Sequence, residues 1–404
     1  MLKRWILVCV LIGSSGCRQA EIKQDSQVPY WLTDFQDVYQ ESPSQAARQW
    51  FREAKSGLFV HLNLASLCER GKTDYLLWNE GKAPDRLLHY VGVSRQDYEA
   101  ASNKDTLLFD HYALERFDAD AICRLAKAAH MKYITFTTIH LGRCFNFKTR
   151  ESEFNSLNAP CQRDLAGDLA KACQRHGLAL FFYVPPEYAQ TKDPEQTRHN
   201  RAVLTELLTQ YGPIAGIWFD GIGNFYKNPE FFAQTKETFA MIRKLQPHAL
   251  ISFKEGGLCD EDFISPEHFM LPFDWEFDTA KRQARYQIRK DRWGKQNATR
   301  WQQHNQTLLR EVNTVMQACT NRDGLHVPSG WINDESARHL TAEEFYYWLK
   351  YSRYTGSNLL MNIGPRADGS IHPDDVKAFT EVGKLIEQRG WPPVVHGVPL
   401  FLAL

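Results

Sequence analysis

Apolar and polar positions follow one another in a repeating strand-then-helix pattern. Short apolar runs rich in β-branched and aromatic residues predict strands at 57–64, 132–139, 178–184, 214–220 and 249–253. Amphipathic stretches between them predict helices at 117–130, 163–176 and 195–211, and one with Pro229 in its first turn. Later in the chain, helices are expected at 301–318, 341–354 and 373–389, with a late strand at 358–363.

The predicted strands are apolar throughout, which is typical of a parallel sheet that helices cover on both faces. A length of 404 residues suits one α/β barrel with generous loops. The sequence therefore predicts an α/β fold, a (β/α)8-type (TIM-like) barrel, in which residues 31–404 form a single catalytic domain.

Residues 1–17 resemble a secretory signal peptide. Lys3 and Arg4 precede a short apolar run, and small residues precede Cys17. The apolar run is too short to cross a bilayer as a helix. We therefore expect export from a bacterial cell as a membrane-anchored lipoprotein, periplasmic or on the cell surface, with Cys17 lipidated. Plain secretion is the alternative, and residues 18–30 form a polar tether.

Composition narrows the class of function. The 48 basic and 48 acidic side chains balance, so no long-range charge attracts nucleic acid, and contact with a membrane is expected only through the lipid anchor. The 24 Phe, 16 Tyr and 11 Trp permit a carbohydrate enzyme, because rings stack on sugar C–H faces. The seven cysteines after Cys17 include no C-x-x-C pair, which indicates no zinc site. Buried free thiols are expected, with one or two disulfides as the alternative.

Polar side chains gather where the predicted strands end. In a parallel barrel these ends share one face, and that face carries the chemistry. Burying an unpaired carboxylate costs several kcal/mol of free energy. An acidic residue that ends an apolar strand is therefore expected to have a counter-ion or a function. The candidate site residues are, in chain order, His61, Asn63, His140, Tyr183, Trp218 and Asp220.

Several landmarks stand in a fixed order between residues 45 and 390. They are residues 50–55 with 57–61, residues 137–140 with 154–156 and 163–165, residues 217–221 (Ile-Trp-Phe-Asp-Gly), and residues 358–365 with 368–369. The ordered set resembles glycoside hydrolase family 29, the α-L-fucosidases.

The resemblance implies a retaining exo-α-L-fucosidase that removes terminal α-L-fucosyl groups from glycans without a metal or cofactor. Asp220 would attack the anomeric carbon and form a covalent fucosyl-enzyme, while a second carboxylic acid protonates the departing oxygen. His61 and His140 match two fucose-binding histidines, and Trp218 precedes the nucleophile as in the family. Asn63 and Tyr183 are further expected contacts of the sugar.

The chain departs from the family pattern at three places. His61-Leu62-Asn63 replaces the usual His-Trp-Gly, and His140-Leu141-Gly142-Arg143 replaces His-His-Asp-Gly. One sugar-binding histidine is thus missing, and a site built to pair a hydroxyl loses heavily without its donor. Three interpretations are open. Asn63 or Arg143 forms the hydrogen bond to that hydroxyl, or the substrate is a different sugar, or the protein binds the sugar without hydrolysing it. The C-terminal β-sandwich that many members carry is expected to be absent.

The acid/base is open among several carboxylates, of which Glu276 is favoured. Glu276 follows Trp275, whose apolar ring would raise a carboxyl pKa, and the pair resembles a Trp-Glu pair of the family. Glu267 lies between Pro266 and His268 and is the runner-up. Glu255 and the early-loop residues Glu69 and Asp74 are further alternatives.

Two other classes of function stand beside the fucosidase. A degenerate barrel would bind fucosylated or related sugars with weak or altered activity. A metal-dependent hydrolase would use His61, His140 and Asp220 as ligands, although the first predicted strand lacks a His-x-His pair.

Overall fold

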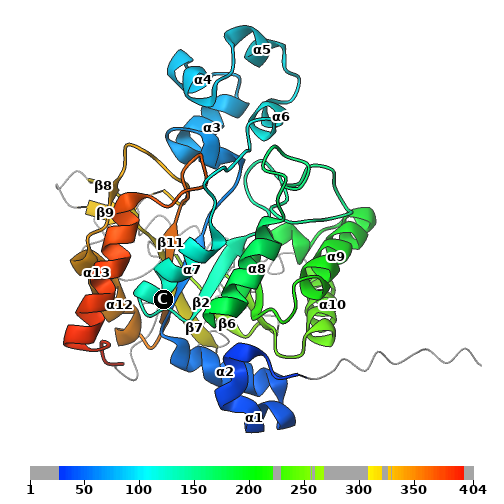
Figure 1. Ribbon diagram of the computed structural model, residues 1–404. Helices are drawn as coiled ribbons and strands as arrows, with labels where there is room; N and C mark the ends of the chain where they lie inside the picture. Colours follow the sequence, from blue (N-terminus) through cyan, green and yellow to red (C-terminus); the bar gives the residue numbers. More distant parts are fainter. Residues whose placement is uncertain are drawn as a thin grey trace, which may run out of the picture.

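A computed structural model describes residues 27–221, 229–254, 256, 260–267, 308–320, 326–328 and 330–394. In this part of the chain, parallel strands close into a barrel (Figure 1). Their order around the barrel is β1-β11-β7-β6-β5-β4-β3-β2. These strands are β1 (Ser56–Val60), β2 (Tyr133–Thr137), β3 (Ala179–Val184), β4 (Gly216–Phe219), β5 (Leu250–Phe253), β6 (Phe263–Ile264), β7 (Leu309–Val315) and β11 (Asn358–Ile363). The predicted TIM-like barrel is confirmed.

The barrel closes because β1 pairs on both sides. Its Gly57 is in register with Tyr133 of β2 and with Leu360 of β11, both in the parallel sense. A small antiparallel sheet lies beside the barrel, with strand order β10-β8-β9. Its strands are β8 (Gln317–Thr320), β9 (His326–Pro328) and β10 (Arg338–His339).

Helices surround the barrel, and most of them alternate with the barrel strands along the chain. The described ones are α7 (Ala119–Ala128), α8 (Leu165–His176), α9 (Pro194–Thr209), α10 (Pro229–Leu245), α12 (Ala342–Tyr354) and α13 (Pro373–Arg389). Asp118 caps α7 as the sequence predicts, because its side chain accepts a hydrogen bond from the Ala121 backbone N–H. None of the helices in the described ranges is long and apolar enough to cross a lipid bilayer.

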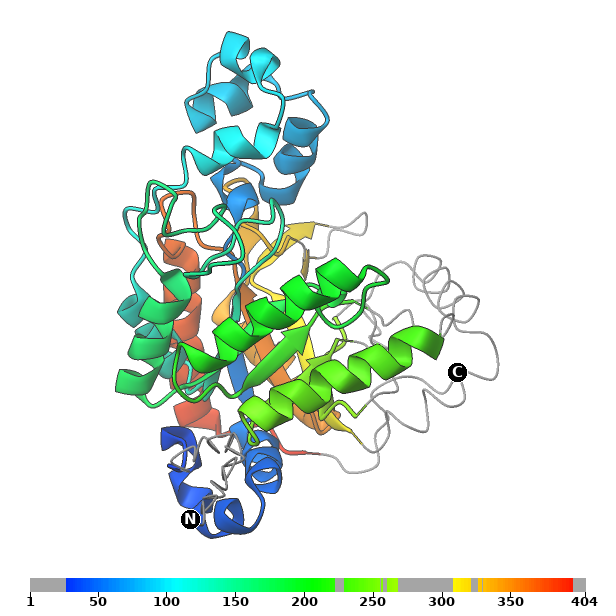
Figure 2. The ribbon, with the colours of Figure 1, turned by 90° about the vertical axis from the view of Figure 1, so that its right-hand side faces the viewer.

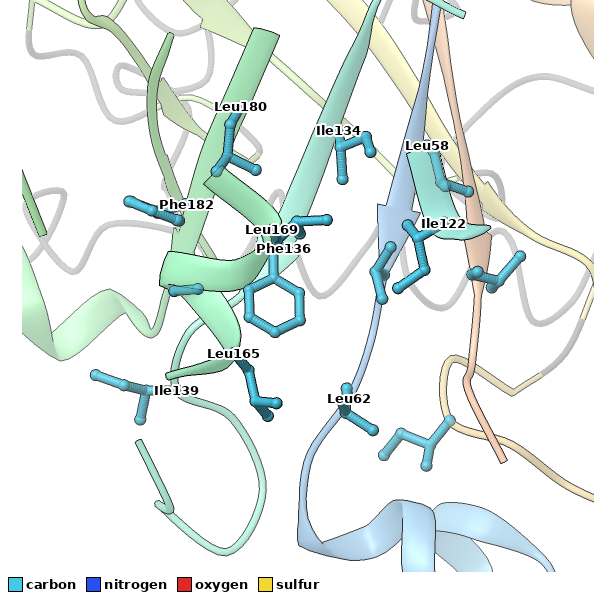
Figure 3. Close-up of a cluster of buried hydrophobic side chains, with 14 of the residues drawn as sticks. Leu58, Leu62, Ile122, Ile134, Phe136, Ile139, Leu165, Leu169, Leu180 and Phe182 are labelled. Atoms are coloured by element: carbon cyan, nitrogen blue, oxygen red, sulfur yellow. The ribbon is translucent and has the colours of Figure 1, made fainter. Parts of the chain in front are cut away.

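Side-chain alternation separates two apolar layers. In β2, Ile134 and Phe136 point outward to the helices, while Tyr133 points into the barrel with Phe59 and Phe181. Figure 3 shows the outer layer between β1, β2, β3 and the helices, and its labelled residues include Leu58, Ile122, Leu165, Leu169, Leu180 and Phe182. Burial on both faces explains why the strands read as continuous apolar runs.

Two sets of short helices lie at opposite ends of the barrel (Figures 1 and 2). At one end are η1 (Tyr30–Phe35), α1 (Gln36–Glu41) and α2 (Pro43–Ala54), which precede β1. At the other end, beyond the carboxyl end of β1, an insertion projects from the molecule. It consists of η2 (Leu64–Leu67), α3 (Gly71–Asn79), α4 (Asp85–Val91), α5 (Arg95–Ala100) and α6 (Lys104–Phe109). The strand-and-helix pattern did not predict this insertion.

The helix predicted at 301–318 is wrong over its described part, because residues 309–315 form β7. The strand carries polar residues that its environment satisfies. Glu311 and Asn313 are buried and hydrogen-bonded to side chains of other strands and of the segment after β6, so the apolar signal of a buried strand is missing. The first strand also ends earlier than predicted, at Val60, since Asn63 caps η2.

Five cysteines in the described ranges are free thiols, and all but Cys161 are buried. They are Cys68, Cys123, Cys144, Cys161 and Cys173. The expectation of buried free thiols is confirmed for the four buried ones. Cys259 lies outside the described residues, as does the side chain of Cys319.

Candidate active site

The carboxyl ends of the strands bring several predicted side chains together. His61 follows β1 directly, and Asp220 follows β4. The Asp220 backbone N–H donates to the Val184 carbonyl over 3.1 Å, and that of Lys254 donates to the Phe219 carbonyl over 2.9 Å. The hydrogen bonds of the parallel ladder thus continue past β4 and β5 and fix where these two side chains begin.

Asp220 accepts hydrogen bonds on both carboxylate oxygens. Oδ1 lies 2.7 Å from Lys254 Nζ and 2.6 Å from the Gly221 backbone nitrogen, and Oδ2 accepts from Tyr183 Oη over 2.7 Å. Burial alone would raise the pKa of Asp220, but the Lys254 ammonium and the hydrogen bonds outweigh it and lower that pKa. Burial and the nearby Asp220 raise the pKa of Tyr183, so its hydroxyl keeps the proton that it donates.

Lys254 also contacts a second carboxylate, that of Glu267. Its Nζ lies 2.6 Å from Glu267 Oε1, just after the short strand β6. The side chains of Lys254 and Glu267 are 14% and 13% exposed, so the ion pair is largely shielded from water. The Asp220 and Glu267 oxygens that contact Lys254 are therefore no more than about 5.3 Å apart, since they lie 2.7 Å and 2.6 Å from the same nitrogen.

The environment of His61 fixes its tautomer. His61 Nδ1 lies 2.6 Å from Asn362 Oδ1, and the Asn362 amide nitrogen donates to the Trp331 carbonyl over 2.8 Å. The Asn362 oxygen is thus the acceptor, so Nδ1 of His61 carries the proton and Nε2 has a lone pair. Burial, with His140 nearby, holds the pKa of His61 well below its ordinary value, and the ring is neutral at pH 7.

His140 has the opposite tautomer. Asn63 Oδ1 accepts from the Ala65 backbone N–H over 3.0 Å, so the Asn63 amide nitrogen donates to His140 Nδ1 over 3.1 Å. The proton of His140 is therefore on Nε2. Burial lowers the pKa of His140 to about 4. With ring centroids 5.1 Å apart, His61 offers an acceptor and His140 a donor, which suits neighbouring hydroxyl groups of one ligand.

The aromatic side chains Tyr183, Trp218 and Trp331 form an aromatic wall beside the site carboxylates and histidines. The rings of Tyr183 and Trp218 stack with centroids 5.5 Å apart, and Trp331 lies 5.1 Å from the His61 ring. Trp218 Nε1 donates to the buried Glu311 over 3.1 Å. Burial raises the pKa of Glu311 to about 7, despite hydrogen bonds from Ser265, Tyr133 and Trp218. Trp218 is thus buried, with one contact of its ring on Tyr183 and its N–H bound inside the barrel.

Other candidates lie away from this cluster. Arg143 forms an ion pair with Glu187 over 3.2 Å, and its side chain is 78% exposed, so of the two proposed substitutes only Asn63 contacts a site histidine. Glu69 and Asp74 are bound to Arg86, at the insertion. These two acids are thus committed to structural ion pairs.

Some predicted residues lie outside the described part of the chain, namely Glu276, Glu255 and Cys17. Among the described residues, no three His, Cys, Asp or Glu side chains are grouped so that they could hold a metal ion.

Sequence reasoning missed four residues that complete the site. Lys254 contacts both carboxylates, Asn362 orients His61, Trp331 packs beside it and Glu311 holds Trp218. Lys254 did carry a signal, because it is a charged residue directly after a predicted apolar strand, as Asp220 is. Asn362 lies inside the late strand and Glu311 inside a segment predicted to be helical, so no pattern singled them out.

Comparison with known proteins identifies the family of this chain. The family model described as alpha-L-fucosidase matches residues 31–391. Among curated relatives, the tissue alpha-L-fucosidase of Rattus norvegicus is 24% identical over 373 residues, covering 86% of this chain and 70% of that protein. The alpha-L-fucosidase 1 of Arabidopsis thaliana is 26% identical over 240 residues, which cover 55% of this chain and 41% of that protein.

Solved structures share the fold. Alpha-L-fucosidase isoenzyme 1 from Paenibacillus thiaminolyticus superposes with a TM-score of 0.62 at 23% identity, covering 86% of this chain and 77% of that one. Alpha-L-fucosidase AlfC from Lactobacillus casei, in complex with its α-L-fucose product, gives a TM-score of 0.58 at 20% identity, covering 85% and 98%. With a family model that matches nearly the whole described chain, the protein belongs to the α-L-fucosidase family of glycoside hydrolases, family 29.

Proposed function

We propose that the protein is a retaining exo-α-L-fucosidase in which Asp220 is the nucleophile and Glu267 the acid/base. The observation that carries this proposal is the contact of both carboxylates with Lys254 Nζ, at 2.7 Å and 2.6 Å. The two oxygens are then no more than about 5.3 Å apart, and the carboxyl groups of retaining glycosidases lie about 5–5.5 Å apart. An inverting enzyme needs a wider gap that admits a water molecule.

Each carboxylate suits its role. Asp220 accepts from Lys254, Tyr183 and Gly221, and these contacts keep it ionised and aligned for attack on the anomeric carbon. Glu267 would donate its proton to the departing glycosidic oxygen and later take a proton from the attacking water. The covalent fucosyl-enzyme links the two steps and gives retention of configuration.

The neutral histidines suit recognition of a fucosyl group. A hydroxyl can donate to Nε2 of His61, and a neighbouring hydroxyl can accept from Nε2 of His140. The rings of Trp331 and Tyr183 beside them suit the apolar face of a deoxy sugar. The AlfC relative, which has been solved with α-L-fucose and with Fuca(1,6)GlcNAc, supports the substrate class.

Asp220→Ala tests the nucleophile. We expect hydrolysis of an aryl α-L-fucoside to fall by roughly a thousandfold or more, with the fold intact, because the covalent step is lost. Azide should restore part of the rate as a small external nucleophile. Near-parental turnover would exclude Asp220 as the nucleophile. No turnover by the parental protein, with fucose binding retained, would favour the degenerate sugar-binding barrel instead.

Leaving groups test the acid/base. A general acid matters most when the departing alcohol is basic and little when it is a nitrophenolate. Glu267→Ala should therefore cripple hydrolysis of fucosyl-oligosaccharides and largely spare formation of the fucosyl-enzyme from an activated aryl fucoside. Glu276→Ala is the matched variant, since Glu276 is the residue that the sequence favours as the acid/base. If only Glu276→Ala shows this substrate dependence, the assignment to Glu267 is wrong.

A further inference from the structure

The ammonium group of Lys254 lies almost equally far from two carboxylates on different strands. It is 2.7 Å from Asp220 Oδ1 and 2.6 Å from Glu267 Oε1. The backbone of Lys254 is held on both sides, because its N–H donates to the Phe219 carbonyl and its own carbonyl accepts from Ser265 over 2.8 Å. The position of this cation between the two acids is thus set by the barrel.

We propose that Lys254 is a fixed counter-ion for the one negative charge that moves between Asp220 and Glu267 during turnover. This inference rests on the proposed function. It assigns to Lys254 a positioning role on both carboxylates, with no covalent part in the reaction.

The charge balance follows from the retaining reaction. In the first step an Asp220 oxygen bonds to the anomeric carbon, the glycosidic bond breaks, and the leaving oxygen keeps the electron pair and takes the proton of Glu267. Asp220 is then a neutral ester and Glu267 a carboxylate. In the second step water bonds to the anomeric carbon and gives a proton to Glu267, while the ester bond breaks and its electron pair returns to Asp220. One negative charge is present before and after each step.

A cation that already touches both oxygens stabilises the charge at either end without moving. Such preorganisation is the form in which electrostatics lowers a barrier most, because nothing must reorganise as the charge shifts. As the acid/base of a retaining reaction, Glu267 enters the first step protonated, so the one negative charge of the resting pair lies on Asp220, which accepts three hydrogen bonds. Within the described ranges, His61, His140 and Tyr183 also face Asp220 or Lys254, and these three side chains are neutral at pH 7.

The test compares Lys254→Met with Lys254→Arg in the full chain, using an aryl α-L-fucoside. Lys254→Met should lower kcat about 10²–10³-fold, slow both formation and hydrolysis of the fucosyl-enzyme, and move the acid limb of the kcat/KM profile to higher pH. Lys254→Arg keeps the charge and should retain kcat within about tenfold, with the acid limb near its parental position. Lys254→Gln and a thermal unfolding scan replace Lys254→Met if that variant does not fold.

Lys72→Met is the control, because Lys72 is an exposed cation that influences His140 and contacts neither carboxylate. It should leave the acid limb in place. A Lys254→Met variant that raises KM with kcat and the pH profile unchanged would show that Lys254 only holds the sugar. An equal shift of the acid limb in Lys72→Met would show that the shift in Lys254→Met reflects the overall surface charge. Either of these two results would overturn the inference. Loss of azide rescue in Asp220→Ala would instead refute the proposed function itself.

Discussion

At the scale of single residues, hydrogen bonds determine which polar atoms of the site are donors and which are acceptors. Asn362 and Asn63 give His61 and His140 opposite tautomers, because each amide has its other end bound elsewhere. Tyr183 donates to Asp220 while its ring stacks on Trp218. The same side chain thus aligns the carboxylate and forms part of the wall beside it.

Tyr183→Phe separates these two functions, because phenylalanine keeps the ring and removes the hydroxyl. We expect kcat to fall about 10–100-fold with KM little changed, since a hydrogen bond to a charged group contributes about 1.5–3 kcal/mol and this one acts on the proposed nucleophile. Steady-state kinetics on an aryl α-L-fucoside measures the split. Tyr75→Phe is the matched control, because Tyr75 donates to Asp105 over 2.9 Å in the insertion. Equal losses in both variants would contradict a role on Asp220.

At the scale of elements, two of the helices around the barrel pack with their backbones in close contact. Helix α13 lies against α7 at Gly383, where an added Cβ would be 1.9 Å from the Ala128 carbonyl oxygen. Only glycine lets the two backbones approach this closely. The contact is on the outer layer of the barrel, away from the carboxyl ends that carry Asp220 and Lys254.

Gly383→Ala should therefore destabilise the protein by roughly 1–3 kcal/mol, because overpacking outweighs the better helix propensity of alanine. Chemical denaturation measures the loss in the free energy of unfolding, and kcat of the folded fraction should be unchanged. Lys384→Ala, at the exposed neighbouring position of α13, should have little effect. A Gly383→Ala variant as stable as the parent would mean that α13 can shift away from α7 at no cost.

At the scale of the whole molecule, buried neutral histidines link stability to pH. His248 lies under the helices that precede β1, with its ring 5.7 Å from Trp31 and its Nδ1 3.3 Å from Tyr39 Oη. Burial lowers the pKa of His248 to about 4, as it does for His140 at the other end of the barrel. The unfolded chain protonates these rings near pH 6.5, whereas the folded protein does so only near pH 4.

The free energy of unfolding should consequently fall as the pH decreases from about 6.5 to 4, by up to about 1.4 kcal/mol per pH unit for each such histidine. Urea unfolding at a series of pH values measures this slope. His248→Gln should make the slope shallower by about one proton, while His111→Gln, an exposed histidine, should not change it. An unchanged slope in His248→Gln would show that the folded protein already protonates His248 in this range.

Location in the cell concerns the whole molecule as well, and we propose that Cys17 is lipidated after export. Cys17→Ser should then move the protein from the membrane fraction to the soluble exported fraction, because buried acyl chains contribute about 0.8 kcal/mol per CH₂. Fractionation and the mass of the mature N-terminus measure this. If the parental protein is soluble and its mature N-terminus is not Cys17, the lipidation proposal is wrong, and the protein is secreted without a lipid anchor.

The sequence by itself determined the barrel and the position of Asp220 at the end of a strand. Strands buried on both faces need unbroken apolar runs, and that signal is local, so β1 to β5 and β11 could be predicted within a few residues. The same rule marked Asp220, His61 and His140, because polar groups at the ends of such runs are exceptions to it.

Only the tertiary structure decided how these residues are used. The strand β7 escaped prediction because Glu311 is polar, and the Tyr133, Ser265 and Trp218 side chains that satisfy it come from distant parts of the chain. Lys254 is an ordinary charged residue in the sequence and gains its role from the approach of Glu267 to Asp220 in space. The burial of a strand leaves a pattern in consecutive residues, which the sequence shows. The pairing of charges depends instead on which strand ends lie side by side when the barrel closes.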